Sequence, residues 1–237
     1  MNYTAISQKV AEVLTECHVT SFPVDCFALL ESYGYRVFTY QELEDKSHEV
    51  YEMCISYSED AFQNGSQKVI AYNEQMPPGR VRFSLMHELG HFLLNHRSSQ
   101  PWVEKEANYF ASHLLAPRIA IHYAGCKNCR DVADRFDMTM EAADYAFQDY
   151  RRWRRMATYR MNSTDKSLYS HFYDKEADCF VYSRTRCAYC GKELINTREA
   201  ICRECDTAMF GRRQRSPRPD LWQVPDGRLY DYLEHGR

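Results

Sequence analysis

Residues 82–96 have the sequence RFSLMHELGHFLLNH, and residues 104–117 have the sequence EKEANYFASHLLAP. The first stretch contains an H-E-x-x-H pattern formed by His87, Glu88 and His91. Residues four apart share one face of a helix, so two imidazoles at this spacing can bind the same ion. Glu88 stands beside them, placed to accept a proton from a water molecule that the ion activates. The pattern predicts a zinc-dependent hydrolase.

The apolar residues around this pattern favour a helix with two different faces. Leu85, Leu89, Phe92 and Leu93 form a stripe, and at 3.6 residues per turn the two histidines project from roughly the opposite side. This arrangement suits a helix at the floor of a cleft, packed below and open above. The alternative is a buried helix whose two histidines are satisfied by hydrogen bonds.

A zinc ion that binds water needs a third protein ligand. We expect His96 on the side of Leu89 and Phe92, away from the histidine pair, and interpret it as structural; its spacing also differs from the three-histidine signature. The next helix offers Glu104, which lies within a predicted apolar stripe, and Glu106, which lies roughly 140° from the middle of that stripe. A carboxylate on a buried stripe needs a partner or a metal. Glu104 is therefore the predicted third ligand and Glu106 the alternative, with Asn108 as a hydrogen-bond partner for a ligand histidine. The stripe consists of Ala107, Phe110, Ala111, Leu114 and Leu115.

Together the two stretches resemble the ImmA/IrrE family of metallo-endopeptidases. That family joins an H-E-x-x-H helix to a second helix of the form E-x-E-A-[ND]-x-F-A-x-x-L-L-x-P, and the resemblance here spans residues 82–117. It implies a zincin-like fold over residues 1–157. It also implies a protein substrate, a helix-turn-helix repressor whose cleavage derepresses genes of mobile elements or stress responses.

Composition narrows the remaining possibilities. The net charge of −3 gives no general attraction to nucleic acid, and no apolar run approaches the 18 residues of a membrane span. The first 19 residues contain acids and lack the apolar core of a signal peptide, so we expect a cytoplasmic protein without a membrane partner. Disulfides are rare in that compartment, and the ten cysteines need another explanation.

Four cysteines near the C-terminus supply that explanation. Two C-x-x-C pairs are separated by eleven residues, and four thiolates in two tight turns can form a closed tetrahedral zinc site. The pairs are Cys187 with Cys190, and Cys202 with Cys205. We expect a zinc ribbon with a small hairpin around Asn196-Thr197; the alternative is a redox pair. The sequence thus predicts two zinc ions, one catalytic and one structural. Cys126 and Cys129 form a lone pair that cannot complete such a site by itself.

The rest of the chain predicts an α+β fold. Expected helices cover residues 3–16, 24–32, 118–123, 131–136, 140–150 and 167–173, and expected strands cover 35–40, 49–57 and 68–73, with a turn over 58–67. In zincin-like peptidases a strand placed like 68–73 forms the upper rim of the cleft, where an extended peptide can add; the alternative is an ordinary edge strand. We expect a polar linker at 162–166. The domains expected are a peptidase domain over 1–157, a ribbon module over 158–210 and a tail over 211–237.

Two questions stay open at the level of sequence. Residues 131–155 resemble a helix-turn-helix that ends in the basic cluster 151–155, so a nucleic-acid contact is one interpretation, and a solvated helical face is the one we favour. With a nucleic-acid contact, the chain could be a regulatory module that binds DNA or a repressor around a non-catalytic metal site. Independently of this, it could be a hydrolase for a substrate other than a peptide. The group that stabilises an oxyanion is also undetermined among Tyr109, His113 and His122.

Overall fold

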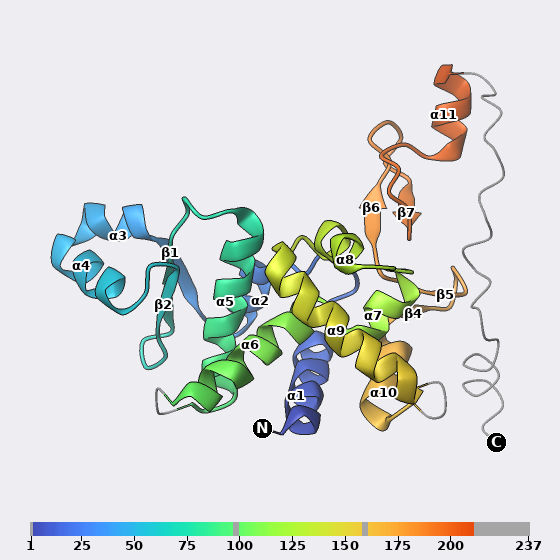
Figure 1. Cartoon of the computed structure of the whole chain (residues 1–237). Coiled ribbons are helices and arrows are strands. Elements are labelled where there is room, and N and C mark those ends of the chain that lie inside the picture. Colours follow the sequence, from blue (N-terminus) through green and yellow to red (C-terminus); the bar gives the residue numbers. More distant parts are fainter. Residues whose placement is uncertain (1, 97–99, 158–160, 211–237) are drawn as a thin grey trace.

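Helices and a small sheet build the N-terminal two thirds of the chain, and a hairpin with one short helix projects from it (Figure 1). The computed structural model describes residues 2–96, 100–157 and 161–210. The α+β class predicted from the sequence is confirmed. None of the helices in these ranges is long and apolar enough to cross a bilayer.

Helices and strands alternate near the N-terminus, and a run of helices follows. The first half contains α1 (Tyr3–Glu16), α2 (Cys26–Ser32), β1 (Arg36–Thr39), α3 (Tyr40–Lys46), α4 (His48–Tyr57), β2 (Ala61–Asn64), β3 (Val69–Tyr72), α5 (Pro78–Leu93) and α6 (Pro101–Leu115). The second half contains α7 (Arg118–Tyr123), α8 (Cys129–Phe136), α9 (Met140–Ala157), α10 (Ser163–Phe172), β4 (Tyr173–Asp174), β5 (Cys179–Phe180), β6 (Arg184–Arg186), β7 (Glu193–Ile195) and α11 (Arg203–Phe210).

The three-stranded sheet has the order β1-β3-β2, so β3 is its central strand. β3 pairs in parallel with β1 and antiparallel with β2, and a turn over residues 65–68 joins β2 to β3. The prediction that the strand at 68–73 forms the rim of the cleft is therefore wrong, because both edges of β3 are already paired. The edge strand that contacts α5 is β2, which the sequence analysis had placed in a turn.

Residues 49–57 form the helix α4, and the strand predicted there is wrong. Ser47 accepts a hydrogen bond from the backbone N–H of Val50, and this N-cap starts the helix. Tyr51, Cys54 and Ile55 then share one face and pack in a small apolar cluster with Tyr40 and Ala71. Short apolar runs do not distinguish strand from helix by their pattern alone, and here the capping residue decides.

The main core lies where α5 and α6 pack against each other and against α1. Leu85, Met86 and Leu89 of α5 and Phe110 of α6 are fully buried. Gly90 allows the two helices to approach closely, since a Cβ atom at this position would lie 2.9 Å from Cδ1 of Phe110. This close approach fixes how α6 lies over the two histidines of α5.

The same core continues beyond residue 158. Leu168 and Phe172 of α10 and Phe180 of β5 are buried in it, and the backbone N–H of Phe22 donates to the carbonyl of Tyr182. The linker predicted at 162–166 is wrong, because α10 begins inside it, at Ser163. We therefore propose that the peptidase domain extends to about residue 182 and that the ribbon starts at β6.

In the C-terminal module, β6 and β7 form an antiparallel hairpin. The first cysteine pair lies in the connection between these strands, and the second lies just before and within α11. The hairpin predicted around Asn196-Thr197 is wrong: Asn196 instead follows β7 and accepts hydrogen bonds from the backbone N–H groups of Tyr182 and Ser183. The predicted tail, 211–237, lies outside the described residues.

Candidate metal centres

The helix α5 carries the histidine pair near its C-terminal end, and a left-handed turn follows its last residue. Asn95 adopts a left-handed conformation with φ of 55°. The backbone N–H of Asn95 donates to the carbonyl of Phe92, and that of His96 donates to the carbonyl of His91. These two bonds form a Schellman motif, which ends a helix and turns the chain back.

His87, His91 and Glu104 lie together, with one ligand atom from each within 4.8 Å of the others. The Nε2 atoms of the two histidines are 2.9 Å apart, and the Glu104 carboxylate oxygens lie 3.3 Å from His87 Nε2 and 3.6 Å from His91 Nε2. Ligands around a tetrahedral zinc ion at about 2.0–2.1 Å are roughly 3.3 Å apart. The three side chains therefore need to move by only a few tenths of an ångström to hold such an ion.

Asn108 determines which ring nitrogen of His87 carries the hydrogen. Its Oδ1 lies 2.9 Å from His87 Nδ1, so Nδ1 donates and Nε2 presents a lone pair. That lone pair faces the Glu104 carboxylate, which is also an acceptor. Two acceptors at 3.3 Å without a hydrogen between them are favourable only with a cation in between, and this donor set suits zinc.

The two imidazoles are in the form that metals bind. Burial lowers the pKa of His87, and burial followed by the nearby His87 lowers the pKa of His91 to about 4. Both rings are thus neutral at pH 7. Burial, and secondarily Glu104, raises the pKa of Glu88 to about 8. A bound cation acts in the opposite direction and favours the Glu88 carboxylate.

Glu88 lies near two tyrosines that flank β1. It contributes to the raised pKa of Tyr35 and of Tyr40, although burial is the larger cause for each tyrosine. Tyr35 donates to the side chain of Gln63 in β2. The carboxylate of Glu88 is thus near enough to Tyr35 and Tyr40 to act on the pKa of both hydroxyl groups.

The structure corrects two details of the predicted ligand helix. His96 does not lie away from the histidine pair, because its Nδ1 is 3.0 Å from Nδ1 of His91. Glu104 is not on the buried stripe: its side chain is 49% exposed, whereas that of Glu106 is only 16% exposed and meets His96 Nε2 at 3.3 Å. Glu104, not Glu106, is the carboxylate that faces His87 and His91.

The three residues weighed as oxyanion stabilisers form hydrogen bonds and ring contacts elsewhere. Tyr109 contacts Ser7 and Asp149 through its hydroxyl group. His113 is buried and stacks on the Tyr109 ring, and His122 contacts Tyr150. Ser7 of α1 and Asp149 and Tyr150 of α9 are far from these residues in the sequence, so no local pattern predicts the contacts.

Part of the chain is similar to a known family of peptidases. Residues 38–148 match the family described as the IrrE N-terminal-like domain of peptidase M78. The match supports a metallopeptidase and includes the histidine pair, Glu88 and Glu104. No curated protein matches the chain.

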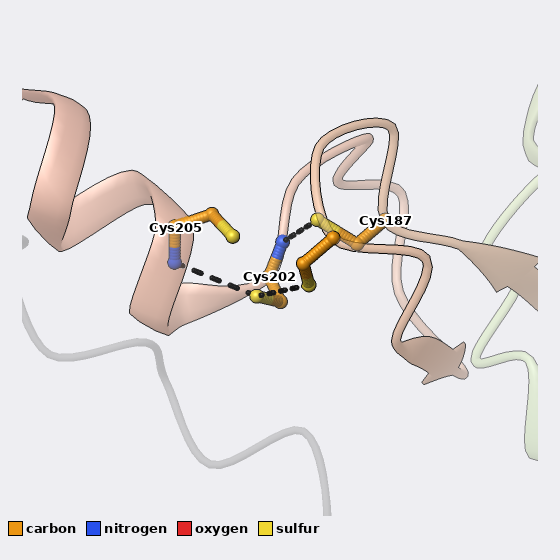
Figure 2. Close-up of side chains that lie close together, drawn as sticks. Cys187, Cys202 and Cys205 are labelled. Carbon is orange, nitrogen blue, oxygen red and sulfur yellow. Dashed lines mark hydrogen bonds between the residues drawn. The ribbon is translucent and has the colours of Figure 1, made fainter.

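C-terminal to the matched residues, the four ribbon cysteines converge. Figure 2 labels three of them, Cys187, Cys202 and Cys205. All four Sγ atoms lie within 4.8 Å of one another, and those of Cys190 and Cys202 are 3.6 Å apart. Tetrahedral zinc with Zn–S bonds of about 2.3 Å separates its sulfurs by roughly 3.8 Å. Backbone N–H groups of Cys190 and Cys202 lower the pKa of the Cys187 thiol to about 6, which favours the thiolate that binds metal.

The lone pair Cys126 and Cys129 differs from this cluster. Burial raises the pKa of Cys126 to about 12, which makes its thiol unreactive at neutral pH. Within the described ranges, neither cysteine belongs to a group of three or more side chains that could hold a metal. Cys126 instead packs in the main core of the protein.

Proposed function

We propose that this protein is a zinc-dependent endopeptidase. The observation that carries the proposal is the convergence of His87, His91 and Glu104 on one point, with Glu88 one residue from His87 on the same helix. A site that only binds a metal has no need of an additional carboxylate beside its ligands. The match to the IrrE N-terminal-like domain supports the same class of activity.

Each residue has a defined role in this proposal. His87, His91 and Glu104 hold the zinc ion, and Glu88 accepts a proton from the attacking water and later donates it to the leaving amine. When bound, zinc lowers the pKa of water and polarises the scissile carbonyl group. The second zinc, at the four cysteines, stabilises the ribbon and takes no part in the reaction.

In this proposal the substrate backbone runs along β2. This strand contacts α5 and pairs with β3 along one edge only, within the part of the chain that the structure describes. An extended peptide can add to such an edge through backbone hydrogen bonds. Gln63 of β2 accepts a hydrogen bond from Tyr35, and the nearby Glu88 helps to raise the pKa of that tyrosine, which links this edge strand to the proposed general base.

The proposed substrate is a helix-turn-helix repressor. The support is the resemblance of residues 82–117 to the ImmA/IrrE family, together with the match to its domain. Cleavage of the repressor would derepress the genes that it controls. We expect weak activity on generic peptides, because a protease of this type selects its partner.

Glu88→Gln tests whether the protein cuts its partner. The variant keeps the size of the side chain and the three proposed ligands but cannot accept a proton, so cleavage should slow by about two or more orders of magnitude. Wild type or variant is co-expressed with a candidate helix-turn-helix repressor, and the repressor is followed by mass spectrometry alongside a reporter. Glu31→Gln, an exposed position on α2, is the matched control and should cut like wild type.

The regulatory binding module makes the opposite prediction. If Glu88→Gln still derepresses the reporter while the repressor stays intact, binding is the mechanism. The structure offers this alternative little support. Trp153, the aromatic residue of the basic cluster, is buried and donates to Asp165. The exposed face of the N-terminal half of α9 carries Glu141 and Asp144. Acids at that position repel the phosphates of nucleic acid.

A further inference from the structure

His96 and Glu106 form a hydrogen-bonded chain that ends on one of the proposed zinc ligands. His91 Nδ1 lies 3.0 Å from His96 Nδ1, and His96 Nε2 lies 3.3 Å from Glu106 Oε2. We propose that Glu106 acts through His96 as a positioning residue that keeps the Nε2 lone pair of His91 free for the metal. The inference rests on the proposed metal site but not on peptidase activity.

The direction of each hydrogen bond follows from Glu106. A carboxylate only accepts, so His96 Nε2 carries a hydrogen and His96 Nδ1 is an acceptor. His91 Nδ1 must then donate, which leaves His91 Nε2 with a lone pair. Without the carboxylate, the opposite order is available: His91 Nε2–H can donate to His87 Nε2, only 2.9 Å away. That tautomer removes the lone pairs of both histidines from the metal.

The surroundings of His96 favour a fixed geometry. Its side chain is only 5% exposed, and the Trp102 ring packs edge-on against it with centroids 6.3 Å apart. The Schellman turn at Asn95 brings it back over His91. His96 is therefore held between α5 and α6, with a nitrogen toward each, whereas His87 has the simpler partner Asn108.

Partners of this kind typically change metal affinity by 10- to 100-fold. Glu106→Gln preserves size and can donate its amide to His96, which permits the competing tautomer. We expect it to weaken metal binding at the histidine site at least tenfold, and His96→Leu, which fills the space, to do the same. The double variant should be no weaker than His96→Leu alone, because Glu106 acts only through His96. Lys105→Gln, exposed on the same helix, should bind like wild type.

The measurement uses the full chain loaded with cadmium, whose NMR resonance distinguishes a four-thiolate site from a histidine–carboxylate site. Affinity comes from chelator competition. In metal-free protein, imidazole ¹⁵N shifts report the tautomer, and Glu106→Gln should move the hydrogen of His91 from Nδ1 to Nε2. The ribbon resonance and the thermal midpoint confirm that each variant is folded.

The outcomes separate this inference from the proposed function. If wild type shows no cadmium at the histidine site, the metal site itself fails. If wild type binds cadmium and Glu106→Gln binds within twofold of it, with an unchanged His91 tautomer, the positioning role is refuted. If Glu106→Gln weakens binding equally in the His96→Leu background, Glu106 acts independently of His96, and the proposed chain is again refuted.

Discussion

Gly90→Ala tests whether close packing of α5 on α6 builds the metal site. The added Cβ would lie 2.9 Å from Cδ1, 3.3 Å from Cγ and 3.4 Å from Cβ of Phe110, which is fully buried. Carbon atoms in contact prefer separations of about 3.5–4.0 Å. Rotating the Phe110 ring moves Cδ1 but not Cγ, which lies on the rotation axis at 3.3 Å, so the helices must separate by a few tenths of an ångström.

The expected size of the effect combines two opposing contributions. Overpacking costs about 1–3 kcal/mol, and replacing glycine inside a helix returns about 1 kcal/mol. We expect a net loss of about 1 kcal/mol, which lowers the thermal midpoint by about 2–4 °C in a chain of this size. The larger effect is on zinc, because ligand distances tolerate changes of only about 0.2 Å. Glu104 on α6 would move away from His87 and His91.

Thermal unfolding with and without zinc, together with chelator competition, measures both effects. Gly65→Ala is the matched control, since its Cβ would lie 3.7 Å from Phe92, an ordinary contact. The double variant Gly90→Ala with Phe110→Leu should recover part of the zinc affinity. A Gly90→Ala protein that is more stable than wild type and binds zinc equally well would show that this approach does not set the ligand geometry.

Two further predictions concern metal content and acid stability. Elemental analysis should find two zinc ions per chain, and Cys187→Ser should lose one of them while the histidine site stays occupied; one zinc in wild type would remove one of the two proposed sites. Burial, helped by Arg118, lowers the pKa of His113 to about 3, against about 6.5 in an unfolded chain. Between these values the unfolded chain binds a proton that the folded chain does not, so the free energy of unfolding should fall with decreasing pH by up to about 1.4 kcal/mol per unit. His113→Phe should flatten this slope in urea titrations from pH 6 to 4, and an unchanged slope would assign the acid sensitivity to other groups.

Sequence alone predicted the parts of the fold that depend on local patterns. Periodic apolar residues identified α1, α5 and α6, and the H-E-x-x-H spacing placed His87 and His91 on one face of α5. The doubled C-x-x-C pattern likewise predicted a cluster that the structure forms. Each of these helices, and each cysteine pair taken by itself, is specified by residues within about four positions of one another.

The wrong predictions concern residues where the backbone departs from a continuous helix or strand. A helical wheel extended past Leu93 placed His96 on the wrong side, because it could not include the left-handed turn at Asn95. For the same reason the burial of Glu106 was missed, since its partner is that displaced histidine. The edge strand β2 was missed because only its pairing with β3 identifies it.

The two proposed metal sites should differ in how much structure depends on the ion. At the histidine site, apolar packing of Phe110 and Leu89 already holds the ligand helices together, so zinc adds stability mainly by binding the folded state. The ribbon has little core of its own: α11 has no buried residue, and Cys187 and Cys202 are themselves the buried side chains near the cluster. A small module of this kind takes its folding free energy from the metal. Chelation should therefore unfold the ribbon and leave α5 and α6 in place.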